Sequence, residues 1–284
     1  MQTIGIYPNS KKTETIPVLH KTVQYLQEKG INVLIPEDIA ILSGLPNLAA
    51  QRDTMKSSIS LALTLGGDGT LLNIAKEMAP LEIPVCGINM GQLGFLTHIE
   101  VSGLIAGLER LIHGNYLLEE RLMLAAVIVR NGQNICIPPA LNDVVITKGS
   151  FARMIHLNLA ISGQITETYP ADGLIIATPT GSTGYSLSAG GPIISPNLKV
   201  TVITPICSHS LNSRSLIVSE EEEIAITLHS THDDMALTID GQKVYSLSSI
   251  DTILVRRSSQ RALFVRFPDC GFYETLHNKL RRHD

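Results

Sequence analysis

The sequence predicts two domains of different classes, an α/β domain followed by an all-β domain. The chain has 284 residues, which is more than one hydrophobic core usually encloses. Strand-like and helix-like segments alternate through the first third, and strand-like segments follow one another after Gly114. We expect the α/β domain to cover residues 1–116 and the all-β domain to cover residues 117–265.

The alternation in the first domain predicts a parallel sheet with helices on both faces, the three-layer arrangement of Rossmann-like folds. The strand-like segments are short and rich in β-branched residues, and the segments between them have helical spacing of apolar residues. The expected strands are residues 3–7, 32–35, 60–65 and 84–88, and the expected helices are residues 16–28, 71–78 and 102–113.

The second domain is expected to be of the β-sandwich type, because helical periodicity fades and strands follow directly on strands. Gly132 and Gly163 stand between strand-like runs, where hairpin turns belong. The expected strands are residues 122–130, 135–140, 143–147, 155–161, 174–177, 199–203, 223–228, 235–239 and 252–257.

Helical spacing returns at the end of the chain. Phe272, Leu276 and Leu280 fall on one face of a helix expected over residues 272–282. We expect this helix to dock on the first domain, so that residues 266–284 join residues 1–116.

Composition and charge exclude several classes of protein. Hydrophobic residues make up 44% and charged residues 17% of the chain, which is typical of a globular protein rather than a disordered one. The net charge is -4 and no long basic run is present, so nucleic acid is not an expected partner. No apolar stretch approaches the roughly 20 residues of a membrane helix, so no membrane partner is expected either.

Cysteine usage indicates a reducing compartment. Cys86, Cys136, Cys207 and Cys270 lie far apart without a C-x-x-C pair, and the N-terminus lacks the pattern of a signal peptide. We expect reduced thiols and a cytoplasmic protein.

A glycine-rich turn, Gly66-Gly67-Asp68-Gly69-Thr70, joins the expected strand 60–65 to the expected helix 71–78. Glycines let backbone N–H groups approach phosphate oxygens, and the helix N-terminus adds partial positive charge. We therefore predict a phosphate loop formed by Gly66, Gly67, Gly69 and Thr70. The dinucleotide pattern G-x-G-x-x-G and the lysine of a P-loop are absent from the turn.

Asp68 stands inside this predicted anion site, where a carboxylate is electrostatically costly. It is favoured there if it orients a metal-bound phosphate or accepts a proton from an attacking hydroxyl, and both roles belong to phosphoryl transfer. The alternative is that Asp68 only caps the helix. Asn73 faces the phosphate end if the helix begins at Thr70, and it is a candidate ligand contact.

The segment 171–192 is dense in hydroxyls and glycines, with one carboxylate, Asp172, and one aromatic residue, Tyr185. Hydroxyls and backbone amides suit a ribose and a phosphate chain, and a carboxylate can accept hydrogen bonds from an amide or amino group. The alternative is a long surface loop, although loops of that length without a function are uncommon.

Together with residues 87–95, 141–145, 239–242 and 272–276, these segments resemble the NAD kinases, which phosphorylate the 2′-hydroxyl of the adenosine ribose of NAD. The resemblance spans nearly the whole chain. The turn 66–70 alone is less specific, because it is also similar to lipid kinases and somewhat to phosphofructokinases.

The resemblance implies roles for individual residues. Asp68 would be the general base, and Asp68 and Gly69 would contact NAD. Asn142 and Asp143 would hold the adenine and ribose, and Asp172 would receive the nicotinamide amide. The remaining NAD contacts would be Thr183, Gly184, Tyr185, Ser186, Leu187, Ser188, Gln242 near the diphosphate, and Arg153 from a neighbouring subunit.

Two positions depart from the family pattern. Many members have a basic residue where this chain has Pro170, so a charge contact is expected to be missing there, and Gly184 stands where alanine is frequent. Lys148 and Arg214 could offer positive charge to phosphates, or could be ordinary surface residues.

The expected function is therefore an NAD kinase with ATP or polyphosphate as the phosphoryl donor and Mg²⁺ as the divalent metal ion, with no residue assigned as a metal ligand. The resemblance also implies a homodimer or homotetramer. Two alternatives stay open at this point: a lipid kinase that uses the same glycine-rich turn, and a dinucleotide sensor without catalytic activity.

Overall fold

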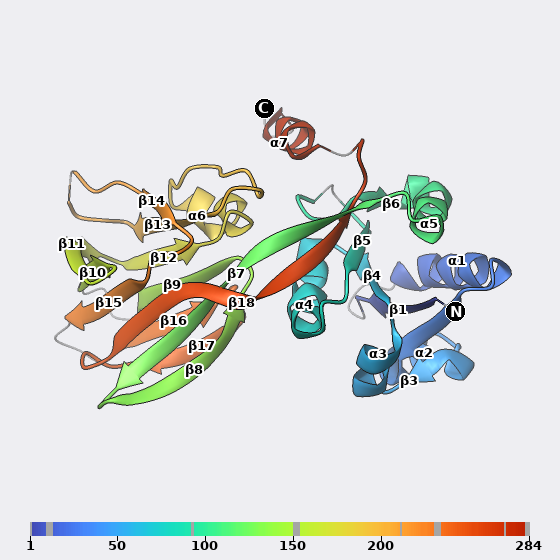
Figure 1. Cartoon of the computed structure of the whole chain (residues 1–284), viewed down its shortest axis with the longest axis horizontal. Coiled ribbons are helices and arrows are strands. Elements are labelled where there is room, and N and C mark those ends of the chain that lie inside the picture. The colour runs from blue at the N-terminus through green and yellow to red at the C-terminus, as the bar shows by residue number, and fades with distance from the viewer. Residues whose placement is uncertain are drawn as a thin grey trace. The chain divides into compact units, whose positions relative to one another are not determined.

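The computed structural model describes residues 2–9, 14–91, 94–149, 154–210, 212–229, 234–269 and 271–281. The chain divides into two compact units, each described by itself below (Figure 1). Unit 1 comprises Met1–Glu120 and Ala262–Asp284, and unit 2 comprises Arg121–Arg261. Unit 1 is therefore built from two separate stretches of chain, and unit 2 from the stretch between them.

A parallel sheet forms the centre of unit 1, with the strand order β5-β4-β1-β2-β3. Every residue of β4 and β5 is buried, as expected for strands covered on both faces. Phe264, near the end of β18 (Thr252–Arg266), pairs in parallel with Val85 of β5. The bounds are β1 (Thr3–Pro8), β2 (Asn32–Pro36), β3 (Ala49–Ala50), β4 (Leu61–Gly66), β5 (Val85–Asn89) and the short β6 (Ile99–Glu100) beside β5.

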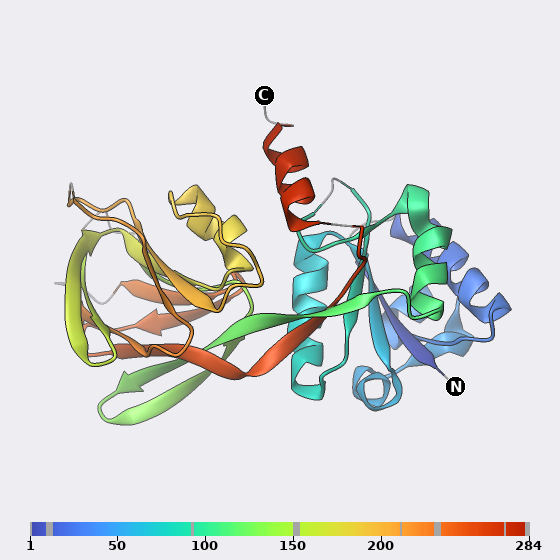
Figure 2. The same cartoon turned by 45° about the horizontal axis from the view of Figure 1, so that its top comes forward.

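Helices cover both faces of this sheet, as the sequence predicted. The connection from β1 to β2 and the connection from β4 to β5 run in opposite directions across the sheet. Since crossovers between parallel strands are right-handed, their helices α1 and α4 belong on opposite faces, which Figures 1 and 2 show. The helices are α1 (Thr15–Glu28), α2 (Glu37–Leu42), α3 (Arg52–Ser58), α4 (Asp68–Met78) and α5 (Leu104–Ile112), and α2 and α3 were not predicted.

The strand order creates a switch point between β1 and β4. These two strands are neighbours, with Pro8 paired to Leu65, and the chain leaves their carboxyl ends in opposite directions. In open α/β sheets, ligands bind outside the carboxyl ends of the strands at such a point. The glycine-rich turn that follows β4 lies there.

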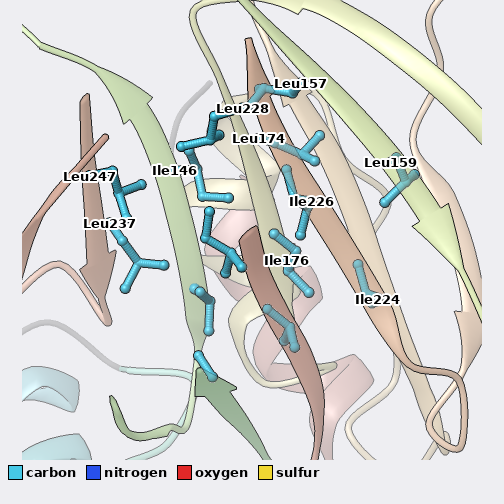
Figure 3. Close-up of a cluster of buried hydrophobic side chains, with 14 of the residues drawn as sticks. Ile146, Leu157, Leu159, Leu174, Ile176, Ile224, Ile226, Leu228, Leu237 and Leu247 are labelled. Carbon is cyan, nitrogen blue, oxygen red and sulfur yellow. The ribbon is translucent and has the colours of Figure 1, made fainter. Parts of the chain in front are cut away.

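Unit 2 consists of two sheets whose inner faces form one core, in agreement with the predicted sandwich. One sheet has the antiparallel order β14-β13-β12-β9-β16-β17, and the other contains β11, β10, β15, β18, β7 and β8. Figure 3 shows the packed leucine and isoleucine side chains, among them Ile146 and Leu174 from the first sheet and Leu157 and Ile226 from the second. The bounds are β7 (Leu117–Arg130), β8 (Gln133–Ala140), β9 (Asp143–Lys148), β10 (Ile155–Ile161), β11 (Gln164–Ala171), β12 (Gly173–Ala177), β13 (Val200–Ile206), β14 (Leu216–Ser219), β15 (Ile224–His229), β16 (Met235–Ile239), β17 (Lys243–Leu247) and β18 (Thr252–Arg266).

The two predicted hairpin turns are confirmed. Asn131 and Gly132 join β7 to β8 with φ of 50° and 76°, and Ser162 and Gly163 join β10 to β11 with φ of 46° and 81°. Two residues with positive φ are the signature of the type I′ turn, whose twist matches that of the strands.

Several sequence-based expectations need correction. The strands β11, β14 and β17 were not predicted, and β18 continues to Arg266 instead of ending at Arg257. The expected all-β region also holds short helical turns, η4 (Gly181–Thr183) and α6 (Tyr185–Ser188). In β11 the first five residues are exposed, so the sequence offers no alternation of buried and exposed positions to read.

The last helix, α7 (Phe272–Arg281), lies in unit 1, as expected. The ring of Phe272 lies 6.4 Å from the ring of Phe95, and Lys279 Nζ lies 4.2 Å from the centre of the same Phe95 ring. Phe272 and Lys279 are seven residues apart and share one face of the helix. That face therefore contacts Phe95.

Candidate active site

The glycine-rich turn is tighter than the sequence suggested. β4 ends at Gly66 and α4 begins at Asp68, two residues before the assumed start at Thr70, because Thr70 and Leu71 both donate their N–H groups to the carbonyl of Gly67. A Cβ on Gly66 would lie 2.4 Å from Thr70 Oγ1, so only glycine fits there. The first N–H groups of α4 thus lie at the switch point, where they can bind an anion.

Asp68 does not cap the helix, and the capping alternative is wrong. It is the first residue of α4, the preceding Gly67 provides no side-chain cap, and the Asp68 carboxylate bonds to a distant segment. Phe95 N–H donates to Oδ2 at 2.7 Å, while the N–H groups of Leu96 and Thr97 donate to Oδ1 at 3.2 and 3.3 Å. The Thr97 hydroxyl also donates to Oδ1 at 3.3 Å. The carboxylate is therefore held in a fixed position at the helix N-terminus.

Asn9 belongs to the same site, and sequence reasoning missed it. It follows β1, its N–H donates to the Leu65 carbonyl at 2.8 Å, and its side-chain amide donates to Thr70 Oγ1 at 3.3 Å. A lone asparagine after a strand carries no motif, and only the adjacency of β1 and β4 reveals it. Asn73 lies one turn after Gly69 and is exposed.

In unit 2, Asp240 holds the predicted Asn142-Asp143 pair. Its carboxylate accepts hydrogen bonds from three successive backbone N–H groups, those of Leu141 at 3.1 Å, Asn142 at 2.7 Å and Asp143 at 3.0 Å. Asp240 itself has φ of 49°, in the left-handed region that aspartate tolerates. The sequence singles out Asp240 only as part of the segment 239–242 and assigns it no role.

Asn142 carries a buried acceptor that none of the described residues satisfies. Its Oδ1 is buried and has no hydrogen-bond partner among the described residues. The backbone around it is fixed, because Thr178 N–H donates to the Asn142 carbonyl at 2.8 Å and a Cβ on Gly181 would lie 2.1 Å from that carbonyl oxygen. A buried acceptor without a donor is costly, so this oxygen is suited to accept from a ligand N–H group.

Asp172 is paired with a lysine. Lys148 Nζ lies 2.7 Å from Asp172 Oδ1, and the Lys148 N–H donates to the Asp172 carbonyl at 2.9 Å. Sequence reasoning expected a missing charge contact because of Pro170. Lys148, on the neighbouring strand β9, brings a positive charge to Asp172 instead.

The first half of the segment 171–192 is buried, which contradicts the surface-loop alternative. Residues 173–182 are buried, and they form β12 and the turn η4. Within the predicted contacts, Ser186 is fully buried and its hydroxyl bonds to Thr204 Oγ1 at 2.9 Å, so it supports the local structure. Tyr185 and Ser188 are exposed, and Thr183, Gly184 and Leu187 are partly exposed.

Gln242 and Arg153 are the remaining predicted residues. Gln242 is exposed in the turn after β16, two residues beyond Asp240, and its N–H donates to the Ile239 carbonyl at 3.0 Å. Arg153 lies outside the described residues. Within the described ranges, no group of three or more His, Cys, Asp or Glu side chains could hold a metal ion.

Two family models match the chain. One describes the ATP-NAD kinase N-terminal domain and matches residues 4–116, and the other describes the ATP-NAD kinase C-terminal domain and matches residues 141–267. The two matches leave only the N- and C-terminal ends and residues 117–140 outside them.

Relatives and solved structures give the same family. An NAD kinase of Natranaerobius thermophilus is 42% identical over 99% of this chain and 98% of its own length, and one of Thermoanaerobacter sp. is 39% identical over 99% of each. A yeast NADH kinase solved with NADH has a TM-score of 0.90 at 26% identity, covering 99% of this chain and 87% of the other. An NAD kinase of Archaeoglobus fulgidus solved with ATP shares the fold, with a TM-score of 0.76 at 24% identity and 99% of each chain covered.

Proposed function

The chain belongs to the ATP-NAD kinase family, whose members are kinases that act on NAD, and from this premise we propose how its residues carry out the transfer. The phosphoryl group passes from ATP or polyphosphate to the 2′-hydroxyl of the adenosine ribose of NAD, which gives NADP. The N-terminus of α4, with Gly66, Gly67, Gly69 and Thr70, holds the phosphates. Asp68 is the general base.

The position of the Asp68 carboxylate carries this proposal. Four hydrogen bonds fix it at the N-terminus of a helix, where an anion is favoured. Such a carboxylate is preorganised to accept a proton from a hydroxyl that attacks a phosphate held by the same helix N-terminus.

The proposed transfer breaks two bonds and forms two. The O–H bond of the ribose hydroxyl breaks and its proton passes to Asp68, while the oxygen forms a bond to the terminal phosphorus of the donor. The bond from that phosphorus to its bridging oxygen breaks, and the shortened donor leaves with the electron pair. Asp68 then releases the proton to solvent.

Unit 2 supplies the recognition of NAD in this proposal. The buried Oδ1 of Asn142 accepts a hydrogen bond from the adenine amino group, and the Asp143 carboxylate accepts from the ribose. Asp172 receives the nicotinamide amide beside Lys148. The buried Ser186 supports this part of the site through its hydrogen bond to Thr204. Arg153 contacts NAD from a neighbouring subunit. The rest of the dinucleotide is contacted by Gly69, Asn73, Thr183, Gly184, Tyr185, Leu187, Ser188 and Gln242.

The phosphates of the donor would hold most of the coordination of the Mg²⁺ ion in this proposal. The described residues offer no cluster that could hold the ion by itself, and Mg²⁺ commonly binds through substrate phosphates and water with few protein ligands. When bound, it neutralises charge on the phosphates.

Asp68→Asn tests the proposal. Turnover should fall by about 100- to 10000-fold, the usual contribution of a general base, while calorimetry should find NAD bound as in the wild type. The matched control is Asp53→Asn, whose side chain is 97% exposed on α3, and its turnover should not change.

The outcomes separate the alternatives. Wild-type turnover in Asp68→Asn would remove Asp68 from its role. Binding of NAD by the wild type without turnover on ATP or polyphosphate would indicate a dinucleotide sensor, and a lipid kinase would phosphorylate a lipid alcohol in preference to NAD.

Assembly and location belong to the proposal as well. We expect a homodimer or homotetramer, which light scattering coupled to size exclusion would measure. Cys86, Cys136 and Cys207 are free thiols, in keeping with a reducing cytoplasm. Among the described residues, no helix combines the length and apolar character needed to cross a membrane.

A further inference from the structure

The segment 94–97 surrounds the carboxylate of Asp68, and its contacts with the two carboxylate oxygens differ. Oδ1 receives three donors, the N–H groups of Leu96 and Thr97 and the Thr97 hydroxyl, at 3.2 to 3.3 Å. Oδ2 receives one donor, the N–H of Phe95, at 2.7 Å. Since each carboxylate oxygen can accept about two hydrogen bonds, Oδ2 keeps the larger remaining capacity to accept.

Close packing at Gly94 makes this arrangement specific. A Cβ on Gly94 would lie 1.8 Å from Asp68 Oδ1 and 2.6 Å from Thr97 Oγ1. Gly94 therefore has to be glycine so that the carboxylate and the threonine hydroxyl can come together.

Thr97 is the one side chain among these donors. It is 1% exposed, so its hydroxyl is shielded from water and is committed to a protein acceptor. The other three donors belong to the backbone and stay in place when a side chain is exchanged. The Thr97 hydroxyl is thus the part of this arrangement that a mutation can remove alone.

We propose that Thr97 is a positioning residue of the transfer: its hydroxyl anchors Oδ1 of Asp68 and leaves Oδ2 as the oxygen that takes the proton. This inference rests on the proposed role of Asp68 as general base. Thr97 touches neither substrate in this proposal and acts only through the carboxylate.

Thr97→Val and Thr97→Ser test the proposal as a pair. Valine keeps the shape and removes the donor, so kcat should fall about 10-fold, the value of one hydrogen bond to a charged group, while KM for NAD and for ATP stays within a factor of about two. Serine keeps the hydroxyl, so its kcat should be close to that of the wild type. Thr22→Val is the control, because Thr22 is a fully buried threonine of α1 whose hydroxyl donates to the Val18 carbonyl of the same helix.

A double-mutant cycle with Asp68→Asn separates this inference from the proposed function. In the Asp68→Asn background the hydroxyl has no carboxylate to anchor, so Thr97→Val should cause little further loss. A kcat of Thr97→Val equal to that of the wild type, or an equal loss in valine and serine variants, would overturn the role of Thr97. An Asp68→Asn variant with wild-type turnover would instead overturn the proposed base.

Folding has to be excluded as the cause of any loss. The thermal unfolding midpoint and NAD affinity of each variant should match those of the wild type. If Thr97→Val does not fold, Thr97→Ala replaces it in the comparison with serine, and equal activity of the alanine and serine variants would refute the proposal.

Discussion

The backbone N–H of Asn142 donates a 2.7 Å hydrogen bond to Oδ1 of Asp240, which also accepts from Asp143. Replacing Asp240 by glycine should raise KM for NAD about 10-fold, as expected when hydrogen bonds to a charged group are lost, with little change in kcat. Glycine tolerates the positive φ of this position, so the backbone is not strained. Steady-state kinetics at saturating ATP would measure the change.

Added formate provides the control for the same variant. The three N–H groups vacated by the carboxylate form an anion-binding concavity, so formate should restore part of the NAD affinity of Asp240→Gly and should not affect the wild type. A wild-type KM for NAD in Asp240→Gly would contradict the positioning role of Asp240.

Replacing Asn9 by alanine should raise KM for ATP about threefold to fivefold, the value of one neutral hydrogen bond, without a change in KM for NAD. The Asn9 amide donates to Thr70 Oγ1, which leaves the Thr70 O–H free to donate to a phosphate oxygen. Asn32→Ala is a matched control, because the Asn32 amide donates to Thr3 Oγ1 at the same 3.3 Å at the amino end of the sheet. Equal effects of the two variants would argue against a phosphate role.

Replacing Phe272 by alanine should lower kcat about threefold to tenfold, because an aromatic pair contributes roughly 0.5–1.5 kcal/mol. Phe272 packs against Phe95, whose N–H makes the shortest hydrogen bond to Asp68. Asn278→Ala, at an exposed position of the same helix, should leave kcat unchanged. A Phe272→Ala enzyme with full kcat would show that α7 does not support the Asp68 carboxylate.

Replacing Arg130 by methionine should destabilise the protein by about 3 kcal/mol at neutral pH, as when a partner of a buried carboxylate is removed. The side chain of Asp251 is 0% exposed, and Arg130 bonds to both of its oxygens, at 2.7 and 2.6 Å. Burial raises the pKa of Asp251, but the hydrogen bonds from Arg130 and from Ser248 N–H outweigh it, and the net pKa is lowered.

The pH dependence of this loss follows from the direction of the shift. Because the folded pKa of Asp251 lies below that of an unfolded carboxyl, near 4, the stabilisation is present above that pH and is lost as the pH falls through the folded pKa. Urea unfolding should therefore show the gap between wild type and Arg130→Met narrowing in acid. Arg256→Met, at an exposed position of β18, should show no such trend.

The sequence predicted the layers and most strands, because buried strands and amphipathic helices leave clear periodicity. It did not predict α2 and α3, which have six and seven residues and so fewer than two full turns. The first five residues of β11 are exposed, which removes the alternation that marks a strand.

The contacts within the site are harder to predict from the sequence than the strands and helices are. Two hydrogen bonds are central to the site, one between Asp68 and Phe95 and one between Asn142 and Asp240. All four residues lie in segments that the sequence singled out. The partners are nevertheless 27 and 98 residues apart in the chain. Motifs reveal which residues matter without revealing which ones touch, since contacts at such separations depend on strand order. Asn9 and Thr97 can be assigned to the site only once the contacts in the folded chain are known.

Unit 1 is formed by two stretches of chain that are separated by unit 2, so the ribosome synthesises its two stretches at different times. Unit 2, Arg121–Arg261, emerges in full before Ala262–Asp284, which carries the pairing of Phe264 with Val85 and the helix α7. Domains tend to fold as units as they are synthesised. Unit 2 can therefore complete its fold before unit 1 does. Residues 94–97, which hold the Asp68 carboxylate, therefore gain their contact with α7 only after Ala262–Asp284 has been synthesised.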